Sequence, residues 1–233
     1  MCGRFTRLYT WKQLHALLDL RYPENIEIKP SWNVAPTQTT PVCRLNKEGE
    51  RELVPMRWGF TPEWSKEGKP GPINARSESI ATSTMFRRAF ASRRCIVPIS
   101  GFYEWKAAPG GKQPHYIRLA SNDTMLLAGI WERWGTGEAA VDTFAILTAA
   151  PNALVARIHD RMPVILEPDG VSQWLDASRP ERAMPDPLAA ERLEAFPVSS
   201  RVNSPRNNDP GLCVPCDPPA GLFDHRAHSA DKP

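Results

Sequence analysis

Hydrophobic positions beyond residue 52 fall into short runs that proline and glycine separate. β-Branched and aromatic residues are frequent in these runs, and both types favour strands. No long helical pattern intervenes, which is typical of an antiparallel sandwich or barrel rather than of a parallel sheet. The runs that we predict to be strands are 53–60, 95–105, 115–120, 125–134, 141–148 and 162–166.

A helical pattern is clearest near the start of the chain. Thr10 and Gln13 match the first and last residues of a capping box, and apolar residues then recur at helical spacing. The elements together predict an α+β fold, a single domain with a mainly antiparallel, sandwich-like or barrel-like sheet and peripheral helices. The segments that we predict to be helices are 10–21, 152–158, 171–175 and 187–196.

The last part of the chain differs from the rest in composition. Proline and glycine are frequent after residue 206 and apolar periodicity is nearly absent, so we predict a domain over 1–206 and a flexible tail over 207–233. Because the spacing of its possible zinc ligands departs from that of the usual zinc finger, we expect no metal and no other cofactor. These residues are Cys213, Cys216, His225 and His228.

Composition excludes several classes of protein. At 233 residues, with 41% hydrophobic and 24% charged residues, the chain is long enough for a substantial core and is neither fibrous nor wholly disordered. No apolar run approaches the roughly 18 residues of a membrane helix, and the N-terminus lacks the apolar segment of a secretory signal. We therefore expect a cytoplasmic monomer that does not bind membranes.

Cysteine and arginine usage adds two hints about chemistry. The five cysteines are an odd number at scattered positions, which fits reduced thiols better than a disulfide framework. The net charge is only +3, but arginine outnumbers lysine 21 to 8. The planar guanidinium suits phosphate groups and stacks on bases, so this bias points toward nucleic acid.

Cys2 is the residue whose position indicates covalent chemistry. Once Met1 is removed, the chain begins with an α-amine and a thiol on adjacent carbon atoms, and both are nucleophiles near neutral pH. With an aldehyde, the amine forms a Schiff base and the thiol then closes a five-membered thiazolidine. Gly3 permits close approach of a ligand, and Arg4 is expected to hold a phosphate and to favour the thiolate. A disordered terminus without function is the alternative interpretation.

Six short motifs combine polar residues with bulky or conformationally special ones. They are Met1-Cys-Gly-Arg-Phe5, Trp32-Asn-Val-Ala-Pro36-Thr-Gln38, Arg57-Trp-Gly-Phe60, Asn74-Ala-Arg76-Ser-Glu78, Gly101-Phe-Tyr-Glu104-Trp105 and His159-Asp-Arg161-Met-Pro163. They resemble, in the same order, motifs of the SRAP family, the abasic-site processing proteins first named SOS-response-associated peptidases. The resemblance runs from residue 1 to about 205 and leaves out the tail.

The resemblance implies an abasic-site sensor that binds single-stranded DNA. A junction between single-stranded and double-stranded DNA is one setting in which the abasic site would be bound. The protein would be associated with the nucleoid when it is bound to damaged DNA. It implies a covalent thiazolidine crosslink between Cys2 and the ring-opened deoxyribose, which protects the lesion during the DNA damage response. This agrees with the chemistry inferred from Cys2 alone. An enzyme with lyase-type Schiff-base chemistry and autoproteolytic removal of Met1 is the expected activity.

The motifs also imply roles for three internal residues. Asn74 would position the terminal residue and the sugar, although a turn residue in the loop around 71–72 is an equally good interpretation. Glu104 would act as general acid and base, because its aromatic neighbours favour the neutral form of a carboxyl group; the alternative is a solvent-facing strand residue. His159 would assist proton transfer at the sugar, and the alternative is a histidine that caps a short helix.

DNA contacts are expected from arginines beside the reactive motifs and from two apolar side chains. Pro36 and Trp64 resemble the elements with which the family stacks on bases and blocks a continuing duplex, although core packing explains Trp64 equally well. The arginine-rich stretch 87–94 would track the strand or form a solvated helix face. Three arginines would hold the phosphates that flank the lesion: Arg4, Arg76 and Arg161.

Three other functions remain as alternatives. An N-terminal-nucleophile amidotransferase also begins with Cys-Gly, but the arginine-bearing motifs have no role in glutamine hydrolysis. A thiol peptidase would use Cys2 with Glu104 or His159 and would act on its own Met1. A non-catalytic reader of damaged DNA would need the arginines and aromatic residues but no free N-terminus.

Overall fold

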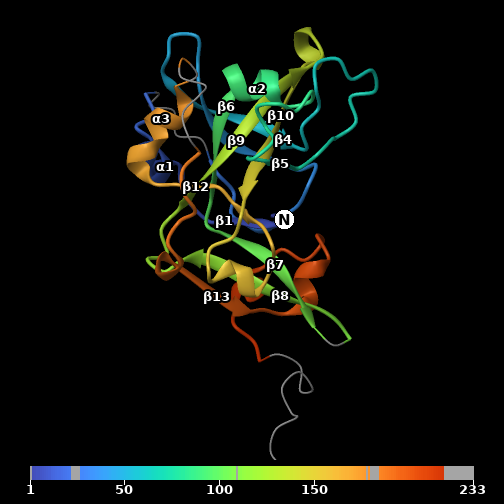
Figure 1. Ribbon diagram of the computed structural model, residues 1–233, viewed down its shortest axis with the longest axis vertical. Helices are drawn as coiled ribbons and strands as arrows, with labels where there is room; N and C mark the ends of the chain where they lie inside the picture. Colours follow the sequence, from blue (N-terminus) through green and yellow to red (C-terminus); the bar gives the residue numbers. More distant parts are fainter. Residues whose placement is uncertain (1, 22–26, 109, 177, 179–183, 218–233) are drawn as a thin grey trace, which may run out of the picture.

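Two β-sheets meet across the middle of the molecule in the computed structural model, with helices around them (Figure 1). The structure describes residues 2–21, 27–108, 110–176, 178 and 184–217. The upper sheet in Figure 1 closes into a barrel, and the lower sheet carries the first strand of the chain. The predicted α+β fold, with a mainly antiparallel, barrel-like sheet and peripheral helices, is confirmed.

Five strands form the barrel: β3 (Thr39–Leu45), β4 (Arg51–Trp58), β6 (Arg94–Ile99), β9 (Met125–Trp134) and β10 (Val141–Ala149). They close in the order β10–β4–β3–β6–β9 and back to β10, and only the β4–β10 pair in this ring is parallel. The predicted strand 125–134 coincides with β9. Three short strands extend the barrel: β5 (Asn74–Arg76) and β11 (Met162–Pro163) beside β10, and β12 (Ile165–Leu166) beside β9.

The lower sheet is antiparallel throughout, and its strand order differs from the chain order. The chain passes from the barrel into this sheet at Ser100, between β6 and β7, so the predicted strand 95–105 is two strands in two sheets. Because Phe5 lies opposite Phe102, the first residues of the chain run beside β7. The spatial order is β13 (Leu193–Pro197), β8 (Gly111–Leu119), β7 (Gly101–Ala108), β1 (Phe5–Arg7) and β2 (Ser31–Val34).

Three α-helices lie outside the sheets within the described ranges: α1 (Trp11–Leu18), α2 (Arg87–Ser92) and α3 (Val171–Leu175). Helix α1 begins as predicted, because Thr10 and Gln13 exchange both hydrogen bonds of the capping box. It ends at Asp19, which has the left-handed backbone conformation of a helix terminus (φ 49°). None of the helices that the structure describes is long and apolar enough to cross a membrane.

Two predicted helices are wrong. Residues 187–196 form instead a 3₁₀ turn, η4 (Ala190–Arg192), followed by β13. Antiparallel pairing of β13 with β8 outweighs the local helical pattern there, since tertiary contacts override a weak propensity. Residues 152–158 contain only the 3₁₀ turn η2 (Val155–Arg157).

Residues 207–217, the first part of the predicted tail, pack onto the lower sheet. Leu212 is fully buried against two tyrosines of that sheet. The Asn208 side chain accepts a hydrogen bond from the backbone N–H of Trp32 at 2.7 Å. Composition alone cannot register such contacts, because they join segments that are distant in the sequence.

We call residues 198–217 the C-terminal strap. It contains the 3₁₀ turns η5 (Ser200–Asn203) and η6 (Pro210–Cys213), and a bridge between Val198 and Pro215 joins its two ends. The backbone N–H of Cys216 donates to the carbonyl oxygen of Pro197 in β13 at 3.0 Å. Residues 218–233, including His225 and His228, lie outside the described residues.

A shared core lies between the barrel and the lower sheet. Phe5 of β1 contacts Trp58 of β4 with ring centroids 4.9 Å apart, and Trp58 stacks on Phe144 of β10 at 6.2 Å. Cys2 is fully buried in the same cluster. The first described residue of the chain therefore lies where the two sheets meet.

Candidate active site

Cys2 is held in place by both sheets. The residues after it continue the β1–β7 ladder, in which the backbone N–H of Tyr103 donates to the carbonyl oxygen of Arg4 at 3.0 Å. From the barrel, the Asn74 side-chain amide (Nδ2) donates to the carbonyl oxygen of Cys2 at 3.0 Å. Because Cys2 is also fully buried, the alternative of a disordered terminus does not hold for this residue.

The Cys2 thiol is neutral in this environment. Burial raises its pKa far above the ordinary value, and the nearby Glu104 carboxylate raises the pKa further. Arg4 opposes this shift through a backbone hydrogen bond to the sulfur. The expectation that the Arg4 side chain favours the thiolate is therefore wrong: the guanidinium is engaged elsewhere.

The Arg4 guanidinium joins the N-terminal segment to the C-terminal strap. Its Nη1 atom donates to Oδ1 of Asn33 and to the carbonyl oxygen of Val202, both at 2.8 Å. Its Nη2 atom donates to the carbonyl oxygen of Asn203 at 3.1 Å. These contacts give Arg4 a structural role, and its contact with a phosphate stays a prediction.

Asn74 lies at the start of β5 and not in a turn, opposite Ile146 in the parallel pair with β10. Its Oδ1 atom is buried and accepts no hydrogen bond from any residue that the structure describes. A buried acceptor without a donor costs about 1–3 kcal/mol. This oxygen is thus suited to a donor on a substrate or on the terminal amine.

Glu104 and His159 line one open hollow of about 480 Å³, together with Trp105, Lys112 and Asn203. Glu104 lies at its base, because this residue is only 2% exposed. The alternative of a solvent-facing Glu104 is therefore wrong. Three separate parts of the chain contribute to the hollow: the β7–β8 hairpin, the loop before β11 and the C-terminal strap.

The His159 ring has a local partner for either protonation state. Its Nδ1 atom lies 3.0 Å from the backbone N–H of Arg161 and 2.8 Å from a carboxylate oxygen of Asp160. The first contact requires an unprotonated Nδ1 atom and the second a protonated one. The Nδ1 atom therefore has a hydrogen-bonding partner whether or not it carries a proton.

Arg161 and Arg76 lie at the same end of β10. Arg161 forms a bidentate ion pair with Glu78, at 2.6 and 2.8 Å, and donates to the carbonyl oxygen of Thr148 at 2.5 Å. The hydrogen bonds from Arg161 lower the pKa of Glu78 to about 2. Arg76 lies opposite Thr148 in the β5–β10 pair, and its exposed side chain has no ion pair or hydrogen bond with the described residues.

The two apolar residues predicted to contact DNA both reach the surface. Trp64 is 67% exposed, so core packing does not explain it. Pro36 is half-buried in the turn that follows β2. Neither position tests a contact with bases, which stays a prediction.

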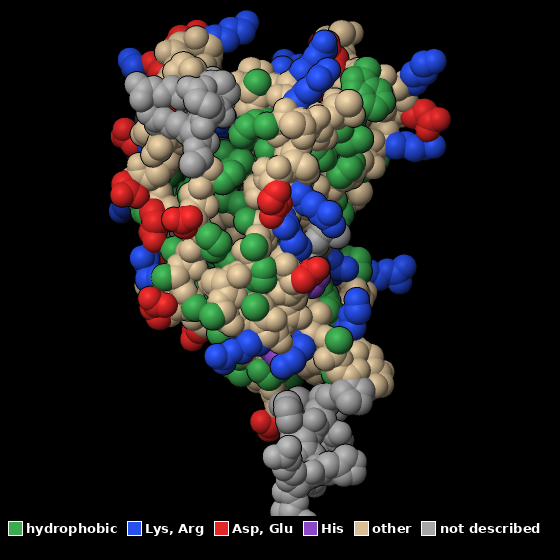
Figure 2. All heavy atoms as spheres, viewed as in Figure 1, with side chains coloured by type: hydrophobic (Ala, Val, Ile, Leu, Met, Phe, Trp, Pro, Cys, Tyr) green, Lys and Arg blue, Asp and Glu red, His purple; other side chains and the backbone are tan. Residues whose placement is uncertain are grey.

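Basic side chains gather at mid-height on the face shown in Figure 2, over the junction of the two sheets. The arginine-rich stretch 87–94 does not present its four arginines together. Arg87 and Arg88 are exposed on α2, whereas Arg93 pairs with Glu132 at 2.6 Å and Arg94 is buried.

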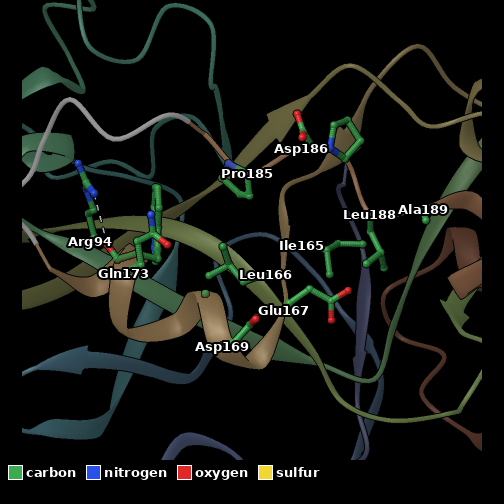
Figure 3. A pocket seen from close by; sticks show the side chains of 13 residues that line it. Arg94, Ile165, Leu166, Glu167, Asp169, Gln173, Pro185, Asp186, Leu188 and Ala189 are labelled. Carbon is green, nitrogen blue, oxygen red and sulfur yellow. Dashed lines mark hydrogen bonds between the residues drawn. The ribbon is translucent and has the colours of Figure 1, made fainter.

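Two other hollows, of about 360 and 530 Å³, lie away from the predicted site residues. Both are lined by Ile165, Leu166 and Glu167, and Figure 3 shows the first, with Arg94 at one end. Apart from Arg94, none of the residues predicted to act in catalysis or DNA binding lines either hollow. Within the described ranges, no group of three or more His, Cys, Asp or Glu side chains is placed to hold a metal ion.

Sequence reasoning missed Lys112, Thr148 and Asn203. Lys112 joins the site because the β7–β8 hairpin pairs it with Ala107, two residues beyond Trp105. Its position shortly after the Gly101–Trp105 motif is the one signal that was available. Thr148 and Asn203 carry no comparable signal, since only the folded chain brings them to the site.

Comparison with known proteins places the chain among relatives of similar length. The family model for "SOS response associated peptidase (SRAP)" matches residues 1–205. Abasic site processing protein YoqW of Bacillus subtilis is 40% identical over 91% of this chain and 98% of its own. Abasic site processing protein YedK of Escherichia coli is 34% identical over 92% and 100%. A solved protein structure from Bacteroides thetaiotaomicron, 24% identical, shares the fold with a TM-score of 0.78 over 92% of this chain and 100% of that one. The chain belongs to the SOS response associated peptidase (SRAP) family.

Proposed function

We propose that this protein processes abasic sites in single-stranded DNA by forming a thiazolidine crosslink between Cys2 and the ring-opened deoxyribose. The observation that carries the proposal is the placement of Cys2. Asn74 donates a hydrogen bond to the carbonyl oxygen of Cys2, and the Glu104 carboxylate lies close enough to the Cys2 thiol to raise the pKa of that thiol. Relatives that are 40% and 34% identical over nearly the whole chain are named abasic site processing proteins, which supports the choice of substrate.

The reaction proceeds through two bond-forming steps. Removal of Met1 makes the α-amine of Cys2 available. The description of the family as a peptidase supports the idea that the chain removes its own Met1. The amine adds to the sugar aldehyde, and loss of one water gives an imine. The thiol sulfur then adds to the carbon of the protonated imine while the thiol proton passes to Glu104, which closes the five-membered ring and leaves one proton on its nitrogen.

Glu104 and His159 supply the proton transfers in this scheme. Glu104 lies at the base of the hollow near the thiol, where its carboxyl group donates a proton to the departing water and accepts the thiol proton during ring closure. The His159 ring, with partners for both of its protonation states, takes the proton of the anomeric hydroxyl as the sugar ring opens. Asn74 Oδ1 accepts a hydrogen bond from the amine or from a sugar hydroxyl.

Backbone contacts to DNA come from the arginines around the end of β10. The unpaired, exposed Arg76 is the first candidate for a phosphate, and Arg161 is held rigidly beside it by Glu78 and Thr148. The exposed Trp64 offers a stacking surface for a base next to the lesion. None of these contacts depends on base identity, as an abasic substrate requires.

The proposal is tested at the chain terminus. A retained N-terminal extension converts the amine of Cys2 into an amide, which cannot form a Schiff base because its lone pair is delocalised. We expect the extended form and Cys2→Ser to bind abasic single-stranded DNA about as tightly as the processed parent. Only the parent gives a crosslink that survives heating in denaturant, with the mass of protein plus DNA minus one water.

Two outcomes contradict the proposal in different ways. If the extended form crosslinks normally, the reactive group is an internal residue. If every form binds but none crosslinks, the protein is a non-catalytic reader of damaged DNA. Borohydride separates imine formation by the amine from ring closure by the thiol. Cys2→Ser retains the amine, so borohydride should trap its imine with the DNA even though no thiazolidine forms.

A further inference from the structure

Asn203 in the C-terminal strap is fixed at both its backbone and its side chain. Its carbonyl oxygen accepts a hydrogen bond from Nη2 of Arg4 at 3.1 Å, and its Oδ1 atom accepts one from the indole Nε1 of Trp105 at 2.7 Å. An indole N–H is only a donor, so it selects the oxygen of the amide and leaves Nδ2 as the remaining donor. Nδ2 forms no hydrogen bond with any residue that the structure describes.

Lys112 brings a second donor to the same hollow. It is exposed on β8, and its ammonium group forms no ion pair with the residues that the structure describes. Lys112 and Asn203 both line the hollow, whereas the carboxylate of Glu104 lies deeper, in a residue that is only 2% exposed. The rim of the hollow therefore presents one full positive charge and one oriented amide donor.

We propose that Lys112 and Asn203 form a subsite for one phosphate of the DNA backbone, next to the sugar that reacts with Cys2; this rests on the proposed function. A sugar hydroxyl would be satisfied by either donor alone, whereas the full charge of Lys112 favours an anion. Because the same hollow contains Glu104 and His159, the phosphate bound there adjoins the reacting sugar.

This subsite sets the path of the DNA strand across the two sheets. Arg76 and Arg161 lie at the end of β10, on the barrel, whereas Lys112 and Asn203 belong to the lower sheet and its strap. One phosphate on each side of the lesion is then held by a different sheet. The sugar between them is brought to the junction where Cys2 lies.

Binding to an unreactive abasic analogue tests the subsite without any crosslinking. Each single-stranded oligonucleotide has one central tetrahydrofuran residue and one neutral methylphosphonate in place of a phosphate. The set of oligonucleotides places the methylphosphonate in turn at each of three positions on either side of the tetrahydrofuran. We expect Lys112→Ala and Asn203→Ala each to raise Kd for the unmodified oligonucleotide by about tenfold. Both variants should become insensitive to methylphosphonate at one shared position, the phosphate that they contact in the parent.

Two further variants separate this subsite from general effects. Lys106→Ala removes the same charge from the same hairpin, but Lys106 does not line the hollow, so this variant should keep the full methylphosphonate pattern of the parent. Asn203→Asp keeps an oxygen for Trp105 and replaces the donor by an acceptor, so it should bind more weakly than Asn203→Ala.

The subsite is ruled out if Lys112→Ala and Asn203→Ala bind as tightly as the parent. It is also ruled out if, at every methylphosphonate position, the loss of affinity caused by the substitution adds to the loss of affinity caused by the methylphosphonate. Both results are independent of the proposed function. That function fails when the parent does not crosslink DNA with a true abasic aldehyde, which the analogue lacks.

Discussion

In the proposed reaction, the neutral thiol at Cys2 decides which nucleophile acts first. A buried sulfur whose pKa is raised by burial and by Glu104 is a poor nucleophile toward the free aldehyde, so the amine begins the reaction. Once the imine has formed, the thiol is held next to an electrophilic carbon and a carboxylate. The group that disfavours the free thiolate then accepts its proton as the carbon–sulfur bond forms.

Glu104→Gln tests this role at the residue scale. Glutamine keeps the shape of the side chain but neither donates nor accepts a proton at neutral pH. We expect unchanged affinity for the unreactive abasic analogue and crosslinking slowed by about a hundredfold, the usual contribution of a general acid or base. Single-turnover rates on gels measure the crosslink, and equal rates for variant and parent would rule out Glu104 as the proton carrier.

At the scale of elements, local signals were predictable from sequence and long-range pairings were not. The capping box at Thr10 and the apolar run over 125–134 lie within one element each, and both predictions hold. The change of sheet at Ser100 and the strand β13 depend on partners far along the chain. The strap is the extreme case, since the contact from Arg4 to Val202 spans 198 positions.

The same distinction applies to the candidate site. Cys2 was identifiable from its chemistry alone, because a terminal thiol and amine form a reactive pair whatever the fold. Asn74, Glu104 and His159 were identifiable only through motifs, and the structure shows what joins them to Cys2: β5, β7 and the loop before β11. Asn203 was not identifiable, because its donor is oriented by Trp105 and Arg4.

Strap packing predicts a difference between two neighbouring substitutions. Leu212 is fully buried in the strap, whereas Val214, two residues later, is 56% exposed. We expect Leu212→Ala to lower the free energy of unfolding by about 3 kcal/mol and Val214→Ala to change it by less than about 0.5 kcal/mol. Urea denaturation measures both, and equal effects of the two substitutions would show that the strap does not contribute to the core.

At the scale of the whole molecule, one continuous interior serves both stability and chemistry. Its two main apolar clusters hold three fully buried thiols, Cys2, Cys43 and Cys95, and burial raises the pKa of each. Of these three thiols, Cys2 is the one beside Asn74 and Glu104, and in the proposed function removal of Met1 adds an amine to it. The other two thiols are part of the packing, so they are inert toward an aldehyde but respond to alkaline pH.

Cys43 makes that response measurable. Burial raises the pKa of its thiol from an ordinary 9.0 to about 12, so between these values the unfolded chain loses the thiol proton while the folded protein keeps it. The unfolded state binds fewer protons in this window, and stability therefore falls as pH rises above 9. We expect the parent to lose about 1.4 kcal/mol more than Cys43→Ala between pH 8 and pH 10, one pKa unit above the unfolded value. Urea denaturation at both pH values gives the comparison, in which the cavity left by alanine cancels because it lowers stability equally at each pH. An identical pH dependence in the two proteins would mean that the Cys43 thiol ionises equally in the folded and unfolded states and is not buried as described.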